Sequence, residues 1–244
     1  MSLGWGVAKP KCIQLGDETS MPILYEDRSV IAIDKPVGWM LVPFTWDRTS
    51  RNLQLAISSS ILGGDFWARS RGLKFLKYVH RLDAETSGVL LFARSHGALQ
   101  SYGELFESRR MQKLYLAVVR GEPRQDEWTC DARLGPDPGQ QHGRHRVDPN
   151  GKDAETHFKV LKRSNGLALI EARPVTGRTH QIRLHLTHAN LPIVGDSVYG
   201  APEDRARKTA LMGLRAVELK YADPFLRKTI CIRAPTEDFI AQFL

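Results

Sequence analysis

Short runs of apolar residues alternate with turn residues along most of the chain. Val30 to Ile33 and Val89 to Ala93 are continuous apolar runs, which are typical of buried strands. The first run leads into the turn residues Asp34-Lys35-Pro36, and the second follows a turn that ends at Gly88. In Leu114 to Val119 successive side chains fall into two alternating sets, as they do on the two faces of a strand. These patterns predict three strands.

A β-hairpin is predicted in the second half of the chain. Thr156 to Leu161 and Leu167 to Ala172 have strand-like patterns and flank Ser164-Asn165-Gly166, a sequence that favours a tight turn. Thr229 to Ile232 predicts a final strand, and we expect a short helix after it. Because hairpins join antiparallel strands, we expect a largely antiparallel sheet.

Three segments carry apolar residues at the spacing of one helix face. Thr49-Ser50 would cap the first and Ser95 the second, because Ser and Thr accept hydrogen bonds from the free N–H groups of a first helical turn. The third follows the turn Thr176-Gly177-Arg178 and is ended by Pro192. The apolar positions are Leu53, Ala56, Ile57 and Ile61 in the first, Ala98, Leu99, Tyr102, Leu105 and Phe106 in the second, and Ile182, Leu186 and Ala189 in the third.

The mixture of hairpins and helices favours a single α+β domain with a mainly antiparallel sheet, flanking helices and a central cleft. The chain shows no internal repeat, low-complexity segment or long linker. Residues 1–22 are poorly patterned and are expected to be peripheral, which leaves residues 23–244 as the domain.

Composition narrows the class of protein. Hydrophobic residues make up 42% of the 244 residues and charged residues 25%, as in ordinary globular proteins. The formal net charge of +8 favours a polyanionic partner such as nucleic acid. No apolar run is long enough to cross a membrane as a helix. Cys12, Cys130 and Cys231 lie too far apart to suggest a disulfide framework or a zinc site, so we expect a reducing, cytoplasmic location.

A cluster of polar residues directly before the apolar run at Val89 is the first candidate site. In an extended chain Arg81 and Asp83 would face the same side, because side chains alternate along a strand. The following Thr86-Ser87-Gly88 favours a loop that presents Asp83. The alternative is an ion pair that only steadies a turn.

A second candidate lies in GRTHQIRLHL, residues 177–186, where arginines and histidines gather at the start of a predicted helix. An arginine here could point into a site that binds an anion, or the residues could form a basic helix face in solvent. The spacing of His180, His185 and His188 does not suit zinc, because they do not share one helix face and the segment contains no glutamate. Tyr115 is a third candidate, either as a core residue or as a ring on which a base stacks.

Together these segments resemble the RluA-type pseudouridine synthases from about Leu24 to Pro235. The matched patterns are HRLDxxTSG at His80 to Gly88, KxYxA with a following glycine at Lys113 to Gly121, GRTHQIR at Gly177 to Arg183, KPxG at Lys35 to Gly38 and PIxGDxxYG at Pro192 to Gly200. Each pattern alone is weak, whereas their combination in this order is specific to the family.

The resemblance implies an enzyme that isomerises a uridine within RNA. The bond from ribose C1′ to uracil N1 breaks, and a bond from C1′ to C5 forms. Asp83 would be the catalytic carboxylate, which either attacks C1′ or removes the C2′ proton. Tyr115 would stack on the base and take the C5 proton, Arg183 would pair with Asp83, and Arg81 would enter the RNA stack after the uridine is turned out.

The resemblance also implies further substrate contacts from the matched motifs, at His80, Thr86, Arg178, Thr179, His180 and Gln181. The reaction requires no cofactor and no metal. Ribosomal and transfer RNA are both open as substrates, and we expect the enzyme to act as a monomer. Too few residues precede Val30 for the S4-type RNA-binding domain of many relatives, so we expect the catalytic domain alone to select the RNA.

One motif departs from the family, and two other functions stay open. Leu214-Arg215-Ala216 stands where relatives often have Leu-His-Ala, which affects local packing or RNA contacts. The chain could bind RNA without catalysis, a function that would not require both Asp83 and Tyr115. It could also be a metal-dependent hydrolase built on its histidines, which metal analysis of the purified protein would reveal.

Overall fold

The computed structural model describes residues 8–16, 19–41, 51–139, 143–206 and 211–244. The strands are β1 (Cys12–Leu15), β2 (Thr19–Glu26), β3 (Val30–Lys35), β4 (Lys77–Tyr78), β5 (Ser87–Ala93), β6 (Gln112–Arg120), β7 (Glu127–Cys130), β8 (Leu134–Pro136), β9 (His145–Val147), β10 (Thr156–Ser164), β11 (Leu167–Pro174), β12 (Leu214–Ala222) and β13 (Thr229–Arg233). The helices are α1 (Leu53–Leu62), α2 (Phe66–Arg69), α3 (His96–Glu107), α4 (Gln181–His188), α5 (Pro202–Ala206) and α6 (Glu237–Ala241).

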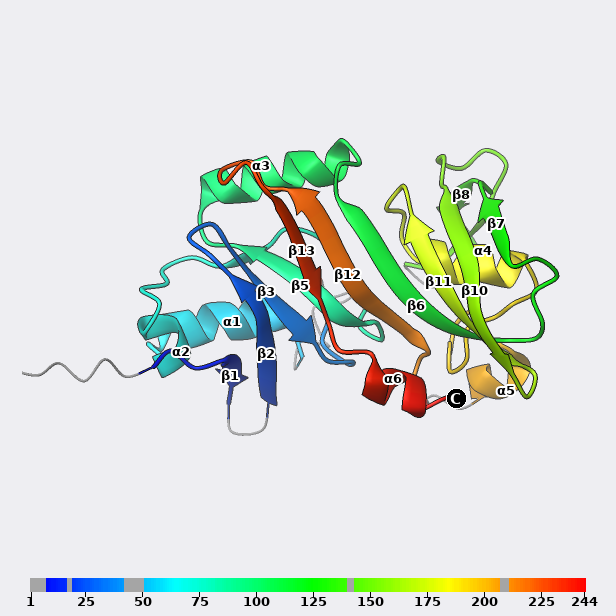
Figure 1. Cartoon of the computed structure of the whole chain (residues 1–244), viewed down its shortest axis with the longest axis horizontal. Helices are drawn as coiled ribbons and strands as arrows, with labels where there is room; N and C mark the ends of the chain where they lie inside the picture. Colours follow the sequence, from blue (N-terminus) through cyan, green and yellow to red (C-terminus); the bar gives the residue numbers. More distant parts are fainter. Residues whose placement is uncertain (1–7, 17–18, 42–50, 140–142, 207–210) are drawn as a thin grey trace, which may run out of the picture.

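One large sheet runs through the molecule (Figure 1). Its strand order is β1-β2-β3-β5-β12-β6-β11-β10-β7, with β13 paired to β12 and β4 to β5. The pairing of β5 with β12 is parallel, and the other pairings between its described strands are antiparallel. The predicted α+β class with a mainly antiparallel sheet is therefore confirmed.

The parallel pairing joins the two halves of the sheet and depends on a glycine. Gly88 pairs with Ala216 and has a φ of +111°. A Cβ atom at this position would lie 2.0 Å from the carbonyl oxygen of Ala216. Only glycine allows β5 and β12 to approach so closely, so the glycine of the HRLDxxTSG motif has a structural role.

Helices cover both faces of the half of the sheet that carries β3 and β5. α1 and α2 pack on one face, where Ile57 and Trp67 meet Phe92 of β5. α3 packs on the opposite face, where Tyr102 meets Leu91 of the same strand. Both faces of β5 are buried, which explains why its apolar run is continuous rather than alternating.

The other half of the sheet is covered in the same way by α4 and α6. Ile182 and Leu186 of α4 pack with Ala117 of β6, whereas Phe239 of α6 packs with Leu116 on the other face. The predicted two faces of the strand around Leu114 to Val119 therefore meet two different helices. No helix of the described residues has the length and apolar character needed to cross a membrane.

The N-terminal segment is the main point at which the prediction was wrong. Residues 1–22 were expected to be peripheral, but the part described from residue 8 onward contributes β1 and the start of β2 to the sheet. Ile13 and Met21 pair across these strands and are fully buried. The expected boundary at residue 22 falls inside β2. β1 buries two side chains and β2 one, which is too weak a pattern to be recognised from the sequence alone.

Several predicted elements agree with the structure, with shifted ends. Ser95 caps α3 by accepting a hydrogen bond from the N–H of Ala98. The hairpin of β10 and β11 turns at Asn165 and Gly166, which both have positive φ. The predicted cap Thr49-Ser50 lies outside the described residues, and Asn52 caps α1 instead. β3 continues through Asp34 and Lys35, which were predicted to form a turn.

Candidate active site

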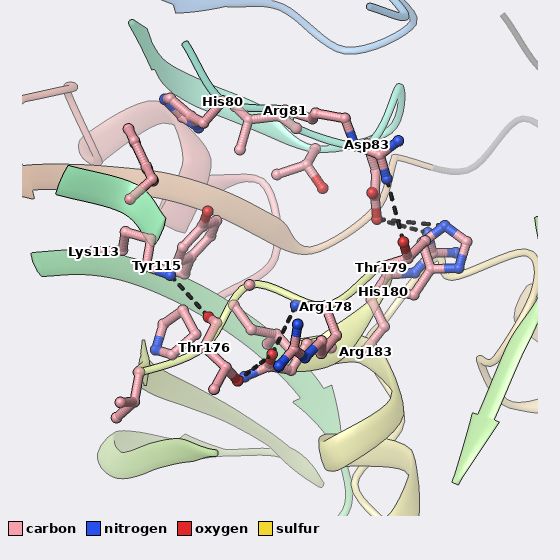
Figure 2. Close-up of a pocket in the computed structure, with 18 of the residues that line it drawn as sticks. His80, Arg81, Asp83, Lys113, Tyr115, Thr176, Arg178, Thr179, His180 and Arg183 are labelled. Atoms are coloured by element: carbon pink, nitrogen blue, oxygen red, sulfur yellow. Dashed lines mark hydrogen bonds and ion pairs between the residues drawn. The ribbon is translucent and has the colours of Figure 1, made fainter. Parts of the chain in front are cut away.

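A cavity of about 480 Å³ lies between three parts of the chain. One wall is the Asp83 loop, residues 79–86, which connects β4 to β5. The second is the Arg183 segment, residues 176–183, which runs from β11 into the first turn of α4. The third is the start of β6 with Lys113 and Tyr115. Figure 2 shows these side chains around the cavity. The volume is typical of a small-ligand site, and the predicted central cleft corresponds to this cavity.

Asp83 is held in its loop by backbone contacts. The N–H of Thr86 donates to the carbonyl oxygen of Asp83 at 3.1 Å, which closes the turn. The next carbonyl oxygen, that of Ala84, accepts from the Gly38 N–H at 2.7 Å and from Lys35 Nζ at 3.2 Å. Lys35 is fully buried, and burial lowers its pKa to about 8. The KPxG segment therefore braces the turn that carries Asp83.

The Asp83 side chain remains accessible while it pairs with Arg183. Its carboxylate is 24% exposed, and Oδ2 accepts from Arg183 Nη1 at 3.0 Å. No hydrogen bond from the described residues reaches the other oxygen, Oδ1. The predicted pairing of Arg183 with Asp83 is therefore present in the structure. The alternative of a local Arg81–Asp83 pair is not, because Arg81 Nη2 donates instead to Thr179 Oγ1 at 3.2 Å.

Arg183 is almost completely buried and is shared by two carboxylates. Its Nε donates to Asp196 Oδ2 at 2.7 Å and its Nη2 to Asp196 Oδ1 at 2.8 Å. Burial acts to raise the pKa of Asp196, but the hydrogen bonds and charge of Arg183 lower it below its ordinary value. The guanidinium carbon also lies 5.1 Å from the centre of the Tyr199 ring, within cation–π range.

His180 connects the Asp83–Arg183 pair to the separate two-stranded sheet formed by β8 and β9. Its φ of +55° is rare for a residue other than glycine and places the imidazole between Asp83 and Tyr199. His180 Nδ1 lies 2.9 Å from the Tyr199 hydroxyl, which accepts from the N–H of His145 in β9. Burial lowers the pKa of His180 to about 4, partly offset by the charge of Asp83. The imidazole is therefore neutral at pH 7.

The turn before α4 is held by Gln181. Its Oε1 accepts from Thr176 Oγ1 at 2.7 Å and from the Arg178 N–H at 2.9 Å. Its Nε2 donates to the Glu155 carbonyl oxygen and to Thr156 Oγ1, both at 2.9 Å. All of its hydrogen-bonding groups are thus engaged within the protein. The observed task of Gln181 is to shape the turn, and its predicted contact with substrate stays a prediction.

Tyr115 and Lys113 project into the cavity from β6. Burial, followed by the charge of Asp83, raises the pKa of the Tyr115 phenol above its ordinary value, so the phenol keeps its proton at pH 7. Lys113 Nζ donates to the Thr176 carbonyl oxygen at 2.8 Å. Burial lowers the pKa of Lys113 to about 8. The cavity thus combines a carboxylate, a neutral aromatic ring and a cation that titrates close to physiological pH.

Comparison with known proteins gives this arrangement a family. A family model described as RNA pseudouridylate synthase matches residues 29–188, which is more than half of the chain. Ribosomal large subunit pseudouridine synthase C of Escherichia coli O157:H7 is 38% identical over 229 residues, covering 91% of this chain and 68% of that protein. The Vibrio cholerae protein of the same name is 33% identical with the same coverage. The chain belongs to the RNA pseudouridylate synthase family.

Solved structures agree with this result at the level of the fold. Human RNA Pseudouridylate Synthase Domain Containing 1 superposes with a TM-score of 0.72 at 24% identity, covering 91% of this chain and 86% of that chain. Human RNA Pseudouridylate Synthase Domain Containing 4 gives 0.68 at 24% identity, covering 89% and 90%. The RluA-type resemblance is confirmed, and the synthase is an isomerase that converts uridine in RNA to pseudouridine.

Two other predicted substrate contacts of the synthase lie in the cavity wall. His80 stacks on Phe106 with ring centres 4.6 Å apart, and its Nε2 accepts from the Leu91 N–H at 3.2 Å. Burial lowers the pKa of His80 to about 3, so it is neutral. Thr86 is 2% exposed. His80 fastens the Asp83 loop to α3 and β5, whereas Thr86 closes the turn within the loop. The contact of either residue with substrate stays a prediction.

Sequence reasoning assigned no role to Asp196, Tyr199 or Lys113 of the synthase. All three occur in motifs that were recognised, PIxGDxxYG and KxYxA. A motif shows that a residue is characteristic of the family, but it does not show which distant side chain the residue contacts. The contacts of Arg183 with Asp196 and with the Tyr199 ring are visible only in the folded structure.

The metal-dependent alternative finds no support in the described residues, where no group of three or more His, Cys, Asp or Glu side chains could hold a metal ion. Both ring nitrogens of His185 contact protein oxygens. Nδ1 lies 3.0 Å from Thr156 Oγ1, and Nε2 lies 3.0 Å from the Ala132 carbonyl oxygen. Arg215, at the position that departs from the family, binds Asp34 at 2.6 Å and Ser87 Oγ at 3.1 Å. Its Nε also donates to the Pro235 carbonyl oxygen at 2.9 Å, so Arg215 links the sheet next to the Asp83 loop to the segment after β13.

Proposed function

We propose that Asp83 catalyses the isomerisation and that the substrate is a uridine of large-subunit ribosomal RNA. The observation that carries the catalytic assignment is the asymmetry of the carboxylate. Oδ2 is held by Arg183 at 3.0 Å, whereas Oδ1 has no hydrogen bond from the described residues and belongs to a side chain that is 24% exposed in the cavity. The relatives that act on large-subunit ribosomal RNA, according to their names, support the substrate assignment.

One accessible carboxylate oxygen is sufficient for either route of the reaction. As a nucleophile it attacks C1′ and releases uracil at N1, and the base then reattaches through C5. As a base it removes the C2′ proton while the bond from C1′ to N1 breaks, which leaves a double bond between C1′ and C2′. C5 then bonds to C1′, and the proton returns to C2′. In both routes the proton lost from C5 is matched by the proton gained at N1, so the sum is an isomerisation without a redox step. A hydrolytic glycosidase would instead place one carboxylate on each side of the glycosidic bond.

Tyr115 offers a ring face to the uracil, and Arg81 is placed to fill the vacated position in the RNA. Because the phenol keeps its proton at pH 7, its ring stacks as a neutral group, and removal of the C5 proton requires its own proton to leave first. Arg81 is exposed, and Thr179 receives its hydrogen bond at the cavity edge. Extruding a base costs a few kcal/mol, which a planar cation stacked in its place offsets.

The other predicted contacts divide by accessibility. Arg178 and Thr179 lie at the cavity edge, where they can reach the RNA backbone. His180 lies beside Asp83 and presents a neutral imidazole to the ribose. We assign His80, Thr86 and Gln181 to the shape of the cavity rather than to hydrogen bonds with substrate. The enzyme acts as a monomer in the cytoplasm and needs neither cofactor nor metal.

Mapping of pseudouridine in cellular RNA tests this proposal. Ribosomal and transfer RNA are compared in cells without the gene, cells with the wild-type gene and cells with Asp83→Asn. We expect one or a few uridines of large-subunit ribosomal RNA to lose modification with the gene, to regain it with the wild type and to stay unmodified with Asp83→Asn. Modification restored by Asp83→Asn contradicts the catalytic assignment, and changes confined to transfer RNA contradict the substrate assignment.

A further inference from the structure

The guanidinium of Arg183 is divided unequally between two aspartates. Its Nε and Nη2 form a two-pronged pair with Asp196, at 2.7 and 2.8 Å, whereas only Nη1 reaches Asp83, at 3.0 Å. The Asp196 side chain is 1% exposed and that of Arg183 is 2% exposed. The reaction described above uses Asp83 and Arg183 but gives Asp196 no task.

Asp196 is itself fixed in one orientation. Its Oδ1 also accepts from the backbone N–H groups of Val198 and Tyr199, both at 2.9 Å. The preceding Gly195 has a φ of +73°, and a Cβ atom there would lie 2.0 Å from the carbonyl oxygen of Leu211. The turn is therefore held against the segment that leads into β12. An aspartate anchored in this way can orient a flexible arginine side chain.

The pairing with Asp196 prevents Arg183 from adopting the geometry that an isolated arginine and carboxylate prefer. The two groups commonly pair through two parallel N–H···O bonds. If Arg183 were free to turn, it could pair with both oxygens of Asp83 in this way and would occupy the atom that must reach the ribose. With Nε and Nη2 already bound to Asp196, Arg183 offers Asp83 a single donor. Asp83 Oδ1 then stays open to the cavity.

The shared cation has a second consequence for charge. Asp196 and Arg183 form a neutral pair, so Asp83 keeps a net negative charge next to them. A carboxylate fully neutralised by its own arginine would be a weaker nucleophile and a weaker base. Glu85 Oε2 lies 3.9 Å from Arg183 Nη1. Because Glu85 adds a further negative charge, it does not neutralise the charge of Asp83.

We propose that Asp196 is a positioning residue that restricts Arg183 to one oxygen of Asp83 and so keeps the other oxygen free for the ribose of the extruded uridine. This inference rests on the proposed role of Asp83. It assigns a task to the aspartate of the PIxGDxxYG motif, which acts through Arg183 and does not touch the substrate.

Single-turnover measurements with saturating enzyme test the proposal. The probe is an in vitro transcript of Escherichia coli large-subunit ribosomal RNA with tritium at C5 of its uridines, and tritium release reports the reaction. Asp196→Asn keeps the shape and can still accept the two backbone N–H bonds. We expect its rate constant to fall about 10- to 100-fold, by analogy with the loss of partners that orient the ligands of a metal site. The dissociation constant of the RNA should change less than about twofold.

A double-mutant cycle separates positioning from general structural damage. Arg183→Met leaves nothing for Asp196 to orient. In that background, adding Asp196→Asn should cause no further loss of rate and should raise the melting temperature, because an unpaired buried charge disappears. If Asp196→Asn lowers the rate by the same factor in both backgrounds, or leaves the wild-type rate unchanged, the proposal is wrong.

Arg183→Lys provides an independent test that does not alter Asp196. A lysine has one charged nitrogen without the two-pronged geometry, and on our proposal it pairs with the buried Asp196. Asp83 then loses its partner, so the rate should fall close to that of Arg183→Met. A rate near that of the wild type would overturn the proposal. Failure of Asp83 itself is distinguishable, because Asp83→Asn would then retain activity, whereas an inactive Asp83→Asn with a fully active Asp196→Asn removes only the role of Asp196.

Discussion

The two main walls of the cavity differ in how their side chains are held. In the Asp83 loop, backbone contacts fix the chain while the functional side chains stay accessible: Asp83 is 24% exposed and Arg81 is exposed. In the Arg183 segment, the side chains of Gln181 and Arg183 are themselves fixed. Gln181 is 4% exposed with every hydrogen-bonding group engaged, and Arg183 is 1% exposed.

This difference indicates that the two walls have different functions. The loop presents the groups that must approach the RNA, because a buried and saturated carboxylate could not reach a ribose. The Arg183 segment supplies a preorganised charge, which requires burial and fixed partners to be effective. Substitutions of Asp83 and Arg81 should therefore affect turnover without affecting stability. Substitutions of Gln181 and Arg183 should affect both.

The largest effect is expected at Asp83. Asp83→Asn is nearly isosteric but can act neither as nucleophile nor as base, so turnover should fall by at least about 10⁴-fold, as when a sole catalytic group is lost. Tritium release from uridine-labelled RNA measures this, and the melting temperature should stay within about 2 °C of the wild type because one accessible side chain changes. Glu85→Gln is the matched control, two residues away and 51% exposed, and should keep most activity.

Arg183→Met should reduce both turnover and stability. Turnover should fall by about 10²-fold or more, because Asp83 loses the group that aims it. The free energy of unfolding should fall by about 3–5 kcal/mol, because Asp196 is left buried and unpaired. Urea denaturation measures the latter. Arg173→Met, which removes an exposed arginine outside the cavity, should cost less than about 1 kcal/mol. Equal stability of the two variants would contradict the difference between the walls.

Tyr115→Phe tests the third side of the cavity. The ring still stacks, so RNA binding should be kept, while turnover should fall by about 10²-fold if the hydroxyl takes part in moving the C5 proton. Single-turnover rates and RNA dissociation constants distinguish the two properties. Tyr115→Leu should weaken RNA binding as well, because the stacking face is removed. If Tyr115→Phe turns over like the wild type, stacking is the whole role of Tyr115 and another group removes the proton.

The smallest expected effect is a pH dependence of stability that arises from Lys113. In the folded protein its pKa is lowered from 10.5 to about 8. Between about pH 8 and 10.5 the unfolded chain therefore binds more protons than the folded one, and the contribution of Lys113 to the free energy of unfolding rises with pH. Below pH 8 the buried ammonium group is destabilising.

Urea denaturation of the wild type and of Lys113→Met at pH 7, 8, 9 and 10 measures this effect. The stability of the wild type relative to Lys113→Met should increase from pH 8 to pH 10. Lys35, whose pKa is also lowered to about 8, titrates in both proteins and cancels from the difference. A difference that stays constant over this range would show that Lys113 is not desolvated in the folded state.

The sequence predicted the features that depend on neighbouring residues. The hairpin at Asn165-Gly166 and the cap at Ser95 were predicted correctly because both depend on backbone conformations and hydrogen bonds within a few residues. The continuous apolar run of β5 marked a doubly buried strand for a similar reason. The motifs identified the family, and with it Asp83, Tyr115 and Arg183 as candidate catalytic residues.

Tertiary structure decided what depends on residues far apart in the chain. The place of β1 and β2 in the sheet, the parallel pairing of β5 with β12 and the hold of Asp196 on Arg183 each join distant segments. No local pattern encodes such contacts, because their free energy comes from burial and from hydrogen bonds that form only when the whole sheet is assembled. For the same reason a motif could name Arg183 as the partner of Asp83, but only the fold shows that a second aspartate determines how the two meet.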